Sequence, residues 1–409
     1  MIEWASSRIF GLNEVGLRIP SALAMAGAIW FLYRIVLRLF DRGTAAIAAF
    51  VFLCGSSFFA VDARPYALPI LCITVATWAI LRWSEANRAI DAAMFIAAGA
   101  LAVYGHCVLS LGLAAPIAYG AAVFRNKPDR LIRLGLMMLA IAALCVPLLP
   151  EVLNFYATRT AHAHAGRPGA GDILIGLIPC GLTGGLVVIV WIERVFRRAV
   201  QLPAEYSHDK ALLAAVWALF APLFLAALSS VSDIQLYVDR YFSCALPGQA
   251  LITGVLLASI RPRFVRQALL ITIALSTIVW GKLLAGSHGN DDWRSAMDLI
   301  HKEAGSAPVL LVSPFAEGAD FRAVHTPALR DILFAPASFY GEPPGAIRLP
   351  HAFAAKEQAE LEAIAARIQN EPRIYLIADK PDRSYETWLV GRLASRCPSE
   401  PLEQSFGQV

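Results

Sequence analysis

Charged side chains are scarce in this sequence. Only 16% of its 409 residues are Asp, Glu, Lys or Arg, while 57% are hydrophobic. A soluble domain carries about 25% charged residues, so the composition excludes an ordinary soluble protein and predicts an integral membrane protein. The net charge of +4 is too small to indicate a nucleic-acid-binding surface, and no nucleic-acid partner is expected.

Ligand motifs are also missing. None of the seven cysteines stands in a C-x-x-C or mixed Cys/His pattern, which gives no support to a zinc site or a disulfide framework. His162 and His164 form an H-A-H pair in a Gly-rich loop, but no carboxylate motif accompanies them, so we favour a solvated loop. A divalent metal is left open as a cofactor. No phosphate loop or dinucleotide fingerprint is present, so a group transfer would need an already activated substrate.

Apolar runs of about 16 to 20 residues recur through the first two-thirds of the chain, the length that a helix needs to cross a bilayer. Ten such runs cover residues 20–39, 44–61, 66–81, 89–104, 107–124, 131–149, 173–192, 211–228, 244–260 and 268–285. We therefore predict an all-α polytopic membrane domain of about ten transmembrane helices in residues 1–285.

Basic residues crowd alternate connections between these runs. They are Arg34, Arg38 and Arg42; Arg82 and Arg88; Arg125, Lys127, Arg130 and Arg133; Arg194, Arg197 and Arg198; and Arg261, Arg263 and Arg266. Such connections face the cytoplasm under the positive-inside rule. We therefore predict a multi-pass protein of the inner (plasma) membrane whose residues 1–17, 58–66, 105–106, 150–172, 229–243 and 286–409 are extracytoplasmic.

The tail, residues 286–409, mixes two periodicities. Apolar, β-rich runs at 308–313 and 373–378 predict buried strands, and residues 293–304, 354–370 and 385–395 predict amphipathic helices. Residues 314–350 are rich in Pro and Gly and are expected to be irregular. The tail is therefore predicted to be a small extracytoplasmic α/β domain.

Polar side chains from separate parts of the chain are predicted to reach the same outer face. The stretch FFAVDARPYALP (58–69) carries Asp62, Arg64 and Tyr66 at alternate positions between two apolar runs. The others are Arg18, Tyr104, His106, Asp239, Arg240 and Tyr241, with Arg159, His162, His164 and Arg167 in the loop after residue 150. Ionisable groups at the edge of a bilayer are functional candidates.

Each of these residues also has a structural interpretation. Arginines beside spans snorkel and tyrosines form interfacial belts, which we favour for Arg18 or Tyr104 taken alone. For His106 the two interpretations are balanced, and Asp239 with Arg240 could be an ion pair. Arginine on the outer face runs against the positive-inside bias, however, which favours a function for Arg64 and Arg240. Outward-facing arginines make a clamp for a phosphate, here a lipid phosphate, beside which a carboxylate could act as base.

Five segments together resemble a known family. GLNEVGLRIPSALA (11–24), VDARPYALPIL (61–71), VYGHCVLSL (103–111), YVDRYFSCALPGQALI (237–252) and DDWRSAMDLI (291–300) resemble the polyprenyl-phosphate-dependent glycosyltransferases of family 39. These GT-C type enzymes include protein O-mannosyltransferases and the lipid A aminoarabinose transferase. The resemblance covers most of residues 11–300 in order, and the sequence after about residue 305 matches no family motif.

The resemblance implies a GT-C membrane fold and a function. Such enzymes pass a sugar from a polyprenyl phosphate carrier, with inversion, to a glycan, lipid or protein acceptor on the extracytoplasmic side. The resemblance also implies roles for single residues. The donor phosphate is contacted by Arg64, Tyr66 and Arg240, and the substrate is contacted by Arg18, His106 and Tyr241. Asp62 stands where members of the family often carry an acid. Membrane lipids are the remaining expected partners.

One departure from the family concerns the catalytic acid. The family's acid usually lies in a first outer loop that follows a first transmembrane helix, whereas Met1 to Trp4 lead straight into the motif at Gly11. We therefore expect the chain to lack an original first span and loop. Glu3 has nothing upstream to anchor it, which leaves Asp62 as the motif-borne acid available as base.

Two other function classes remain open from the sequence. The first is a catalytically inactive family member that binds lipid phosphate as a membrane subunit, which would show donor binding without turnover. The second is a transporter of a lipid-linked substrate, which would carry ionisable residues deep within its spans. The predicted spans hold few charges, and the polar groups gather at one rim, so glycosyl transfer is the leading hypothesis.

Overall fold

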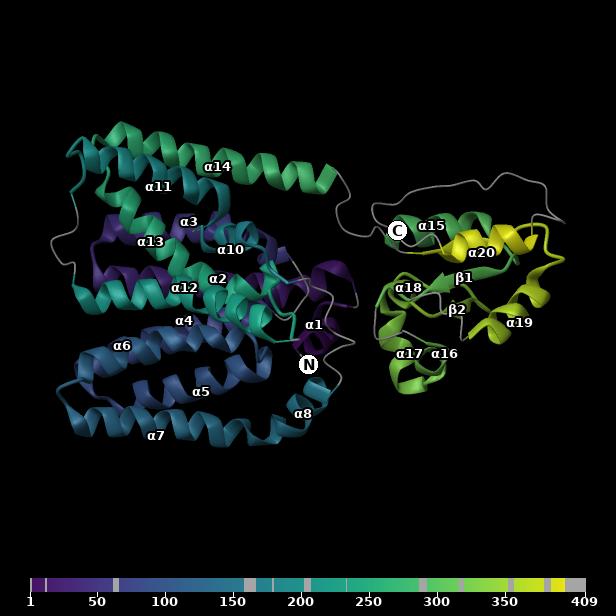
Figure 1. The fold of residues 1–409 in the computed structure, drawn as a ribbon, viewed down its shortest axis with the longest axis horizontal. Coiled ribbons are helices and arrows are strands. Elements are labelled where there is room, and N and C mark those ends of the chain that lie inside the picture. Colours follow the sequence, from purple (N-terminus) through teal and green to yellow (C-terminus); the bar gives the residue numbers. More distant parts are fainter. Residues whose placement is uncertain are drawn as a thin grey trace. The chain divides into compact units, whose positions relative to one another are not determined.

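A computed structural model gives the fold of this protein (Figure 1). It describes residues 2–11, 13–61, 66–157, 167–178, 180–201, 207–232, 234–286, 293–315, 320–351, 357–378 and 384–393. The chain divides into two compact units, Met1–Ile278 and Val279–Val409. The first is helical, and the second contains a small parallel sheet.

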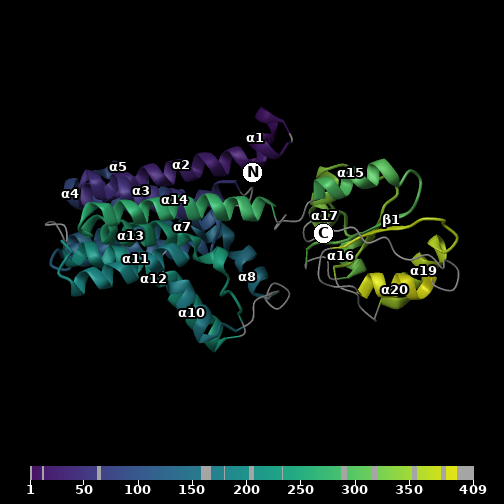
Figure 2. The same ribbon diagram turned by 90° about the horizontal axis from the view of Figure 1, so that it is seen from above.

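In the first unit most of the long helices run side by side in roughly the same direction, as both views show (Figures 1 and 2). Its helices are α1 (Ile2–Phe10), α2 (Glu14–Leu39), α3 (Arg42–Val61), α4 (Ala67–Ala86), α5 (Ala89–Gly105), α6 (Ala114–Phe124), α7 (Pro128–Cys145), α8 (Leu149–Ala157), α10 (Ala170–Leu177), α11 (Gly181–Phe196), α12 (His208–Val231) and α13 (Leu246–Ser259), with 3₁₀ segments η1 (Leu109–Leu113), η2 (Val146–Leu148) and η3 (Asp239–Ala245). Helix α14 (Arg263–Gly286) begins in this unit and continues past its last residue, Ile278. Each of the ten predicted apolar runs overlaps one helix or consecutive helical segments.

Five of the described helical stretches are long and apolar enough to cross a bilayer, or six if the bent pair α10 and α11 counts as one span. Helix α3, helix α5 and the segment η1–α6 contribute shorter apolar stretches. The first unit is therefore a multi-pass membrane domain. The α13 span is 78% buried within the protein, whereas the span that contains α7 is only 11% buried. Helix α13 thus lies inside the bundle, and α7 lies at its periphery with its apolar side chains outward.

The start of α2 differs from the prediction. The sequence suggested that a helix begins at Pro20, but α2 begins at Glu14 and contains Pro20 in its interior. Asn13 caps the helix, because its side-chain oxygen accepts a hydrogen bond from the Gly16 N–H at 2.8 Å. Proline is common in a first turn, which made Pro20 a misleading start signal.

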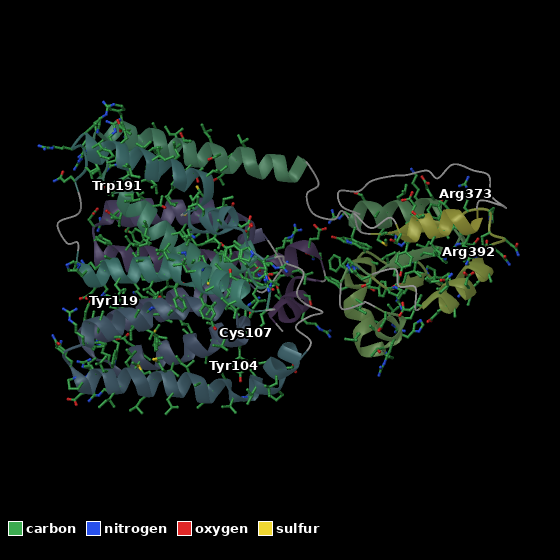
Figure 3. All side chains as sticks on the ribbon, viewed as in Figure 1. Tyr104, Cys107, Tyr119, Trp191, Arg373 and Arg392 are labelled. Carbon is green, nitrogen blue, oxygen red and sulfur yellow. The ribbon has the colours of Figure 1, made fainter. Side chains whose placement is uncertain are left out.

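The arginine-rich connections lie together at one end of the bundle. There Arg38 forms a two-pronged ion pair with Glu85, with Nε and Oε1 2.7 Å apart. Asp91 is fully buried, and its Oδ1 lies 3.0 Å from Nε of Arg82. Tyr119 and Trp191 mark this end in Figure 3, and Tyr104 and Cys107 mark the opposite one.

The second unit is built on a three-stranded parallel sheet. Strand β1 (Val309–Val312) lies in the middle, with β2 (Ile347–Leu349) on one side and β3 (Tyr375–Ile377) on the other. All four residues of β1 are buried, as expected for a central parallel strand. Its helices are α15 (Trp293–Glu303), α16 (Phe321–His325), α17 (Pro327–Leu333), α18 (Ala335–Phe339), α19 (Gln358–Ile368) and α20 (Ser384–Leu393).

The expectation that residues 314–350 are irregular is wrong in part. This segment holds the short helices α16, α17 and α18 and the edge strand β2. Its prolines do not break these helices, because Pro327 and Pro336 stand in their first turns, where no intrahelical N–H is required. The strand itself is only three residues long, too short to show an alternation of apolar and polar residues.

Candidate functional site

Four aromatic rings form a continuous row at the bundle end that carries Tyr104 and Cys107. The Tyr66 ring lies 5.6 Å from the His106 ring, and the His106 ring lies 5.4 Å from the Tyr241 ring. Phe59 extends the row, with its ring edge-on to Tyr66 at 6.0 Å. The guanidinium carbon of Arg240 lies 5.4 Å from the centre of the Tyr241 ring. We call Tyr66, His106, Arg240 and Tyr241 the ring cluster.

Helix ends place the first half of the ring cluster. Tyr66 is the N-cap residue of α4 and is buried, while His106 is the C-cap residue of α5 and has an extended backbone. The two helix ends approach closely at Gly105, where an added Cβ would lie 2.8 Å from Cγ of Pro69. Only a glycine leaves the room that brings the His106 ring against Tyr66.

The η3 turn supplies the other half. It is tied to α12 by a hydrogen bond from the indole N–H of Trp217 to the carbonyl oxygen of Cys244, at 3.1 Å. It also packs on η1, because a Cβ at Gly112 would lie 3.2 Å from Cβ of Cys244. Pro247 stands in the first turn of α13, where the 3₁₀ turn passes into that helix. The last four residues of η3 are buried, so Arg240 and Tyr241 project from a fixed base.

Electrostatics favour a neutral His106. This residue lies in the turn between α5 and η1, outside the candidate spans. Burial lowers the pKa of His106 below its ordinary value, and the positive charge of Arg240 lowers it further. A neutral imidazole has one donor and one acceptor nitrogen. Beside a permanent guanidinium charge, it can therefore hydrogen-bond a substrate hydroxyl or phosphate without adding a second cation.

Arg240 carries a charge that no carboxylate neutralises within the described residues. Its side chain is exposed, and no ion pair with Asp239 or another described acid is present. The ion pair between Asp239 and Arg240 that the sequence left open is therefore not formed. An exposed guanidinium beside a ring is suited to bind an anion with two parallel hydrogen bonds.

Three of the described buried polar atoms without protein partners belong to His106, to η3 or to the segment just before η3. They are Nδ1 of His106, the hydroxyl of Ser243 and Oε1 of Gln235. Buried polar groups in folded proteins are almost always hydrogen-bonded, so such atoms call for a water or ligand partner. The atom of His106 belongs to the ring cluster, and Ser243 lies in the same turn as Arg240 and Tyr241, which supports a polar binding site there.

Other predicted site residues have partners outside the ring cluster or lie outside the described residues. Arg18 pairs with Glu14 at 3.7 Å on the surface of α2. The Tyr104 hydroxyl donates to the carbonyl oxygen of Leu144 at 3.0 Å. Asp62 and Arg64, with Arg159, His162 and His164, lie outside the described residues. In sequence, Asp62 and Arg64 follow Val61 at the end of α3 and precede Tyr66 of the cluster.

Sequence reasoning missed Phe59 and Ser243. Phe59 stood within an apolar run and gave no polar signal. Ser243 lies three residues after Arg240, the repeat of a 3₁₀ turn, but a lone serine in an apolar segment carries no signal by itself. Among the described residues, no three His, Cys, Asp or Glu side chains are grouped to hold a metal ion.

Comparisons with known proteins agree with part of this picture. Residues 1–153 match the family model of dolichyl-phosphate-mannose-protein mannosyltransferases, which covers Tyr66 and His106 but not η3. Two crystal structures of ArnT from Cupriavidus metallidurans, one in the apo state and one bound to undecaprenyl phosphate, are similar at 19% identity with TM-scores of 0.46 and 0.44. Each comparison covers 75% of this chain, which spans about half the length of the ArnT chains, at 53% and 54%. No match was found among curated proteins.

Proposed function

We propose that this chain is a membrane glycosyltransferase. It moves a sugar from a polyprenyl phosphate carrier to an acceptor on the extracytoplasmic face, with inversion at the anomeric carbon. The observation that carries this proposal is the ring cluster itself. Tyr66 and His106 contact each other within the segment that matches the mannosyltransferase family model. The His106 ring also contacts Tyr241, which lies outside that segment and beside the guanidinium of Arg240.

The chemistry assigns a role to each residue. The acceptor hydroxyl gives its proton to a base, for which we propose Asp62, and its oxygen attacks the anomeric carbon. The bond between that carbon and the phosphate oxygen breaks, and the electron pair leaves on the polyprenyl phosphate. Arg240 and Arg64 stabilise this departing dianion. Tyr66 contacts the phosphate, and Arg18, His106 and Tyr241 contact the substrate.

The proposal includes an architecture for the membrane domain and an orientation in the membrane. The first unit is a GT-C-like bundle of about ten spans, and the ten predicted runs that fall on helices support this number. The arginine-rich end faces the cytoplasm, so the ring cluster and residues 286–409 are extracytoplasmic. The protein lies in the inner membrane, and its acceptor is a glycan, a lipid or a protein. The family whose model matches residues 1–153 is named for dolichyl-phosphate-mannose, which supports the donor class.

A second candidate is a subunit that binds the lipid phosphate without turning it over. The observation that favours it is the same exposed Arg240 beside Tyr241, because a clamp for phosphate needs no base. Transport is less well supported. Among the described residues the one fully buried charged side chain is Asp91, which pairs with Arg82 at the arginine-rich end instead of standing along a path through the bundle.

A transfer assay separates these candidates. Membranes that contain the chain are given a polyprenyl-phosphate-linked, radiolabelled sugar, and label that leaves the lipid fraction is counted. Because the acceptor could itself be a lipid, label on products other than the polyprenyl phosphate donor is counted within the lipid fraction too. We expect transfer by the wild type and a loss of about 100-fold in Arg240→Ala, as for removal of a group that stabilises developing charge. Arg197→Ala is the matched control, because Arg197 pairs with Glu193 at the opposite end of the bundle. Lipid binding without release of label would select the binding subunit, and equal transfer by both variants would remove Arg240 from the site.

A further inference from the structure

Among the described residues, two buried hydroxyls have no hydrogen-bond partner, those of Ser243 and Thr253, and only Ser243 lies in the turn that carries Arg240. The side chain is 1% exposed, and its oxygen has no hydrogen-bond partner among the described residues. Two other buried hydroxyls show the usual arrangement, in which the side chain donates to a carbonyl of its own helix. Ser56 donates to Phe52 at 2.6 Å, and Thr77 donates to Ile73 at 2.8 Å. An unpaired buried hydroxyl destabilises the protein relative to alanine at the same place, so a serine here calls for a partner that is not part of the fold.

The geometry of η3 indicates where that partner lies. A 3₁₀ helix has three residues per turn, so side chains at positions i and i+3 eclipse one another. Arg240 and Ser243 therefore lie on one side of η3, with Arg240 exposed and Ser243 a turn deeper and buried. The bond from Trp217 to Cys244 and the close approach of Gly112 hold this turn in place. A ligand whose anionic group meets Arg240 would direct its next polar atoms toward Ser243.

We propose that Ser243 is a further ligand-binding residue, which hydrogen-bonds an oxygen of the lipid donor's head group while Arg240 holds the phosphate. The inference rests on the proposed function. It adds to the proposed site a residue that lies deeper in the protein than Arg240. The ligand atom is a phosphate oxygen or a hydroxyl of the attached sugar. Both are oxygens that a serine hydroxyl can bond, and a pair of lipids with and without the sugar distinguishes them.

The test uses the full chain in lipid nanodiscs. Dolichyl phosphate and dolichyl-phosphate mannose are titrated against wild type, Ser243→Ala and the near-isosteric Ser243→Cys, whose thiol is a weak donor. Unfolding temperatures are recorded without lipid. Ser56→Ala is the control, because Ser56 is equally buried but bonded within its own helix. We expect both Ser243 variants to keep or raise the lipid-free unfolding temperature and to bind at least one lipid about tenfold more weakly, while Ser56→Ala binds as the wild type does.

The outcomes distinguish a phosphate contact, a sugar contact and a purely structural role for Ser243. Weaker binding of both lipids assigns Ser243 to the phosphate, and weaker binding of the mannose lipid alone assigns it to the sugar. Wild-type affinity for both lipids in Ser243→Ala overturns the inference, as does a lowered unfolding temperature with unchanged affinity, which would show a structural role. If the wild type binds neither lipid, both the inference and the proposed function fail. If the wild type and the Ser243 variants bind equally well, only the inference fails.

Discussion

The imidazole ring of His106 lies between the rings of Tyr66 and Tyr241, 5.6 Å from the first and 5.4 Å from the second. Two of these residues end or begin neighbouring helices, and the third comes from a turn much later in the chain. The arrangement makes His106 the link between the family-matched segment and η3. Changes that move or charge this ring should therefore affect both stability and substrate binding.

The first prediction concerns pH. Because the pKa of His106 is lowered in the folded protein, the unfolded chain takes up its proton at a higher pH than the folded chain does. Folding stability should thus fall as the pH drops through the ordinary histidine range toward the folded-state pKa. His106→Gln should show a smaller fall, measured by thermal unfolding in detergent between about pH 5 and 8. His208→Gln, at an exposed position on α12, should follow the wild type; equal slopes in all three proteins would contradict the burial of His106.

The second prediction concerns the helix contact that positions His106. In Gly105→Ala the added Cβ would lie 2.8 Å from Cγ of Pro69, so the end of α5 must move away from α4. We expect a loss of about 1–3 kcal/mol in the free energy of unfolding, as for other overpacked sites, together with weaker donor binding. Gly135→Ala is the control, since nothing lies within 4 Å of its added Cβ, and alanine should there stabilise α7. A Gly105 variant as stable as the Gly135 variant would show that the helix ends are not in close contact.

The third prediction concerns the opposite end of the bundle. Asp41 caps α3 by accepting from the backbone N–H groups of Gly43 at 2.8 Å and Thr44 at 3.1 Å, and from the Thr44 hydroxyl at 2.6 Å. Asp41→Ala should cost about 1 kcal/mol, and Asp41→Asn should retain most of the stability. The Thr44 hydroxyl, followed by these backbone groups, lowers the pKa of Asp41. Its contribution should therefore be present above the ordinary aspartate pKa and be lost as the pH falls below it. Identical acid unfolding of wild type and Asp41→Asn would argue against this cap.

The fourth prediction concerns orientation. Cys107 is an exposed thiol next to His106 at the ring-cluster end. In a Cys397→Ser background, a membrane-impermeant maleimide should label Cys107 in spheroplasts, and Cys107→Ser should abolish the signal. A cysteine placed at exposed Arg197, at the other end, should be labelled only after the membrane is opened. The reverse pattern would place the ring cluster on the cytoplasmic side.

The helices could be predicted from the sequence because a membrane span requires a long apolar run, which is visible in the sequence. The errors lie where single residues give ambiguous signals. Pro20 suggested a helix start, although Asn13 supplies the cap. Pro327 and Pro336 suggested irregular chain, although they begin short helices. The pairing of β2 with β1 joins residues that are distant in sequence, and local patterns do not encode such contacts. The existence and length of strand β2 could therefore not be predicted.

The site residues were proposed from the sequence for a related reason. Tyr66, His106, Arg240 and Tyr241 could be named because polar groups are rare at the edges of apolar runs. The ring-to-ring contacts could not be predicted, because they depend on tertiary packing such as the approach of Gly105 to Pro69. Arg18 had the same sequence signal, yet the structure pairs it with Glu14. Ser243 gave no such signal, because it is singled out only by the burial of its hydroxyl without a hydrogen-bond partner, which the sequence does not show.

The most direct measurement uses a polyprenyl phosphate that carries a photoreactive group beside the phosphate. After illumination with the full chain in nanodiscs, the attachment sites are mapped by mass spectrometry, with unlabelled lipid as competitor. We predict competed attachment within residues 101–111 and 237–246, which contain His106, Arg240 and Tyr241, and its loss in Arg240→Ala. Competed attachment confined to the arginine-rich end, near Tyr119 or Trp191, would contradict the account.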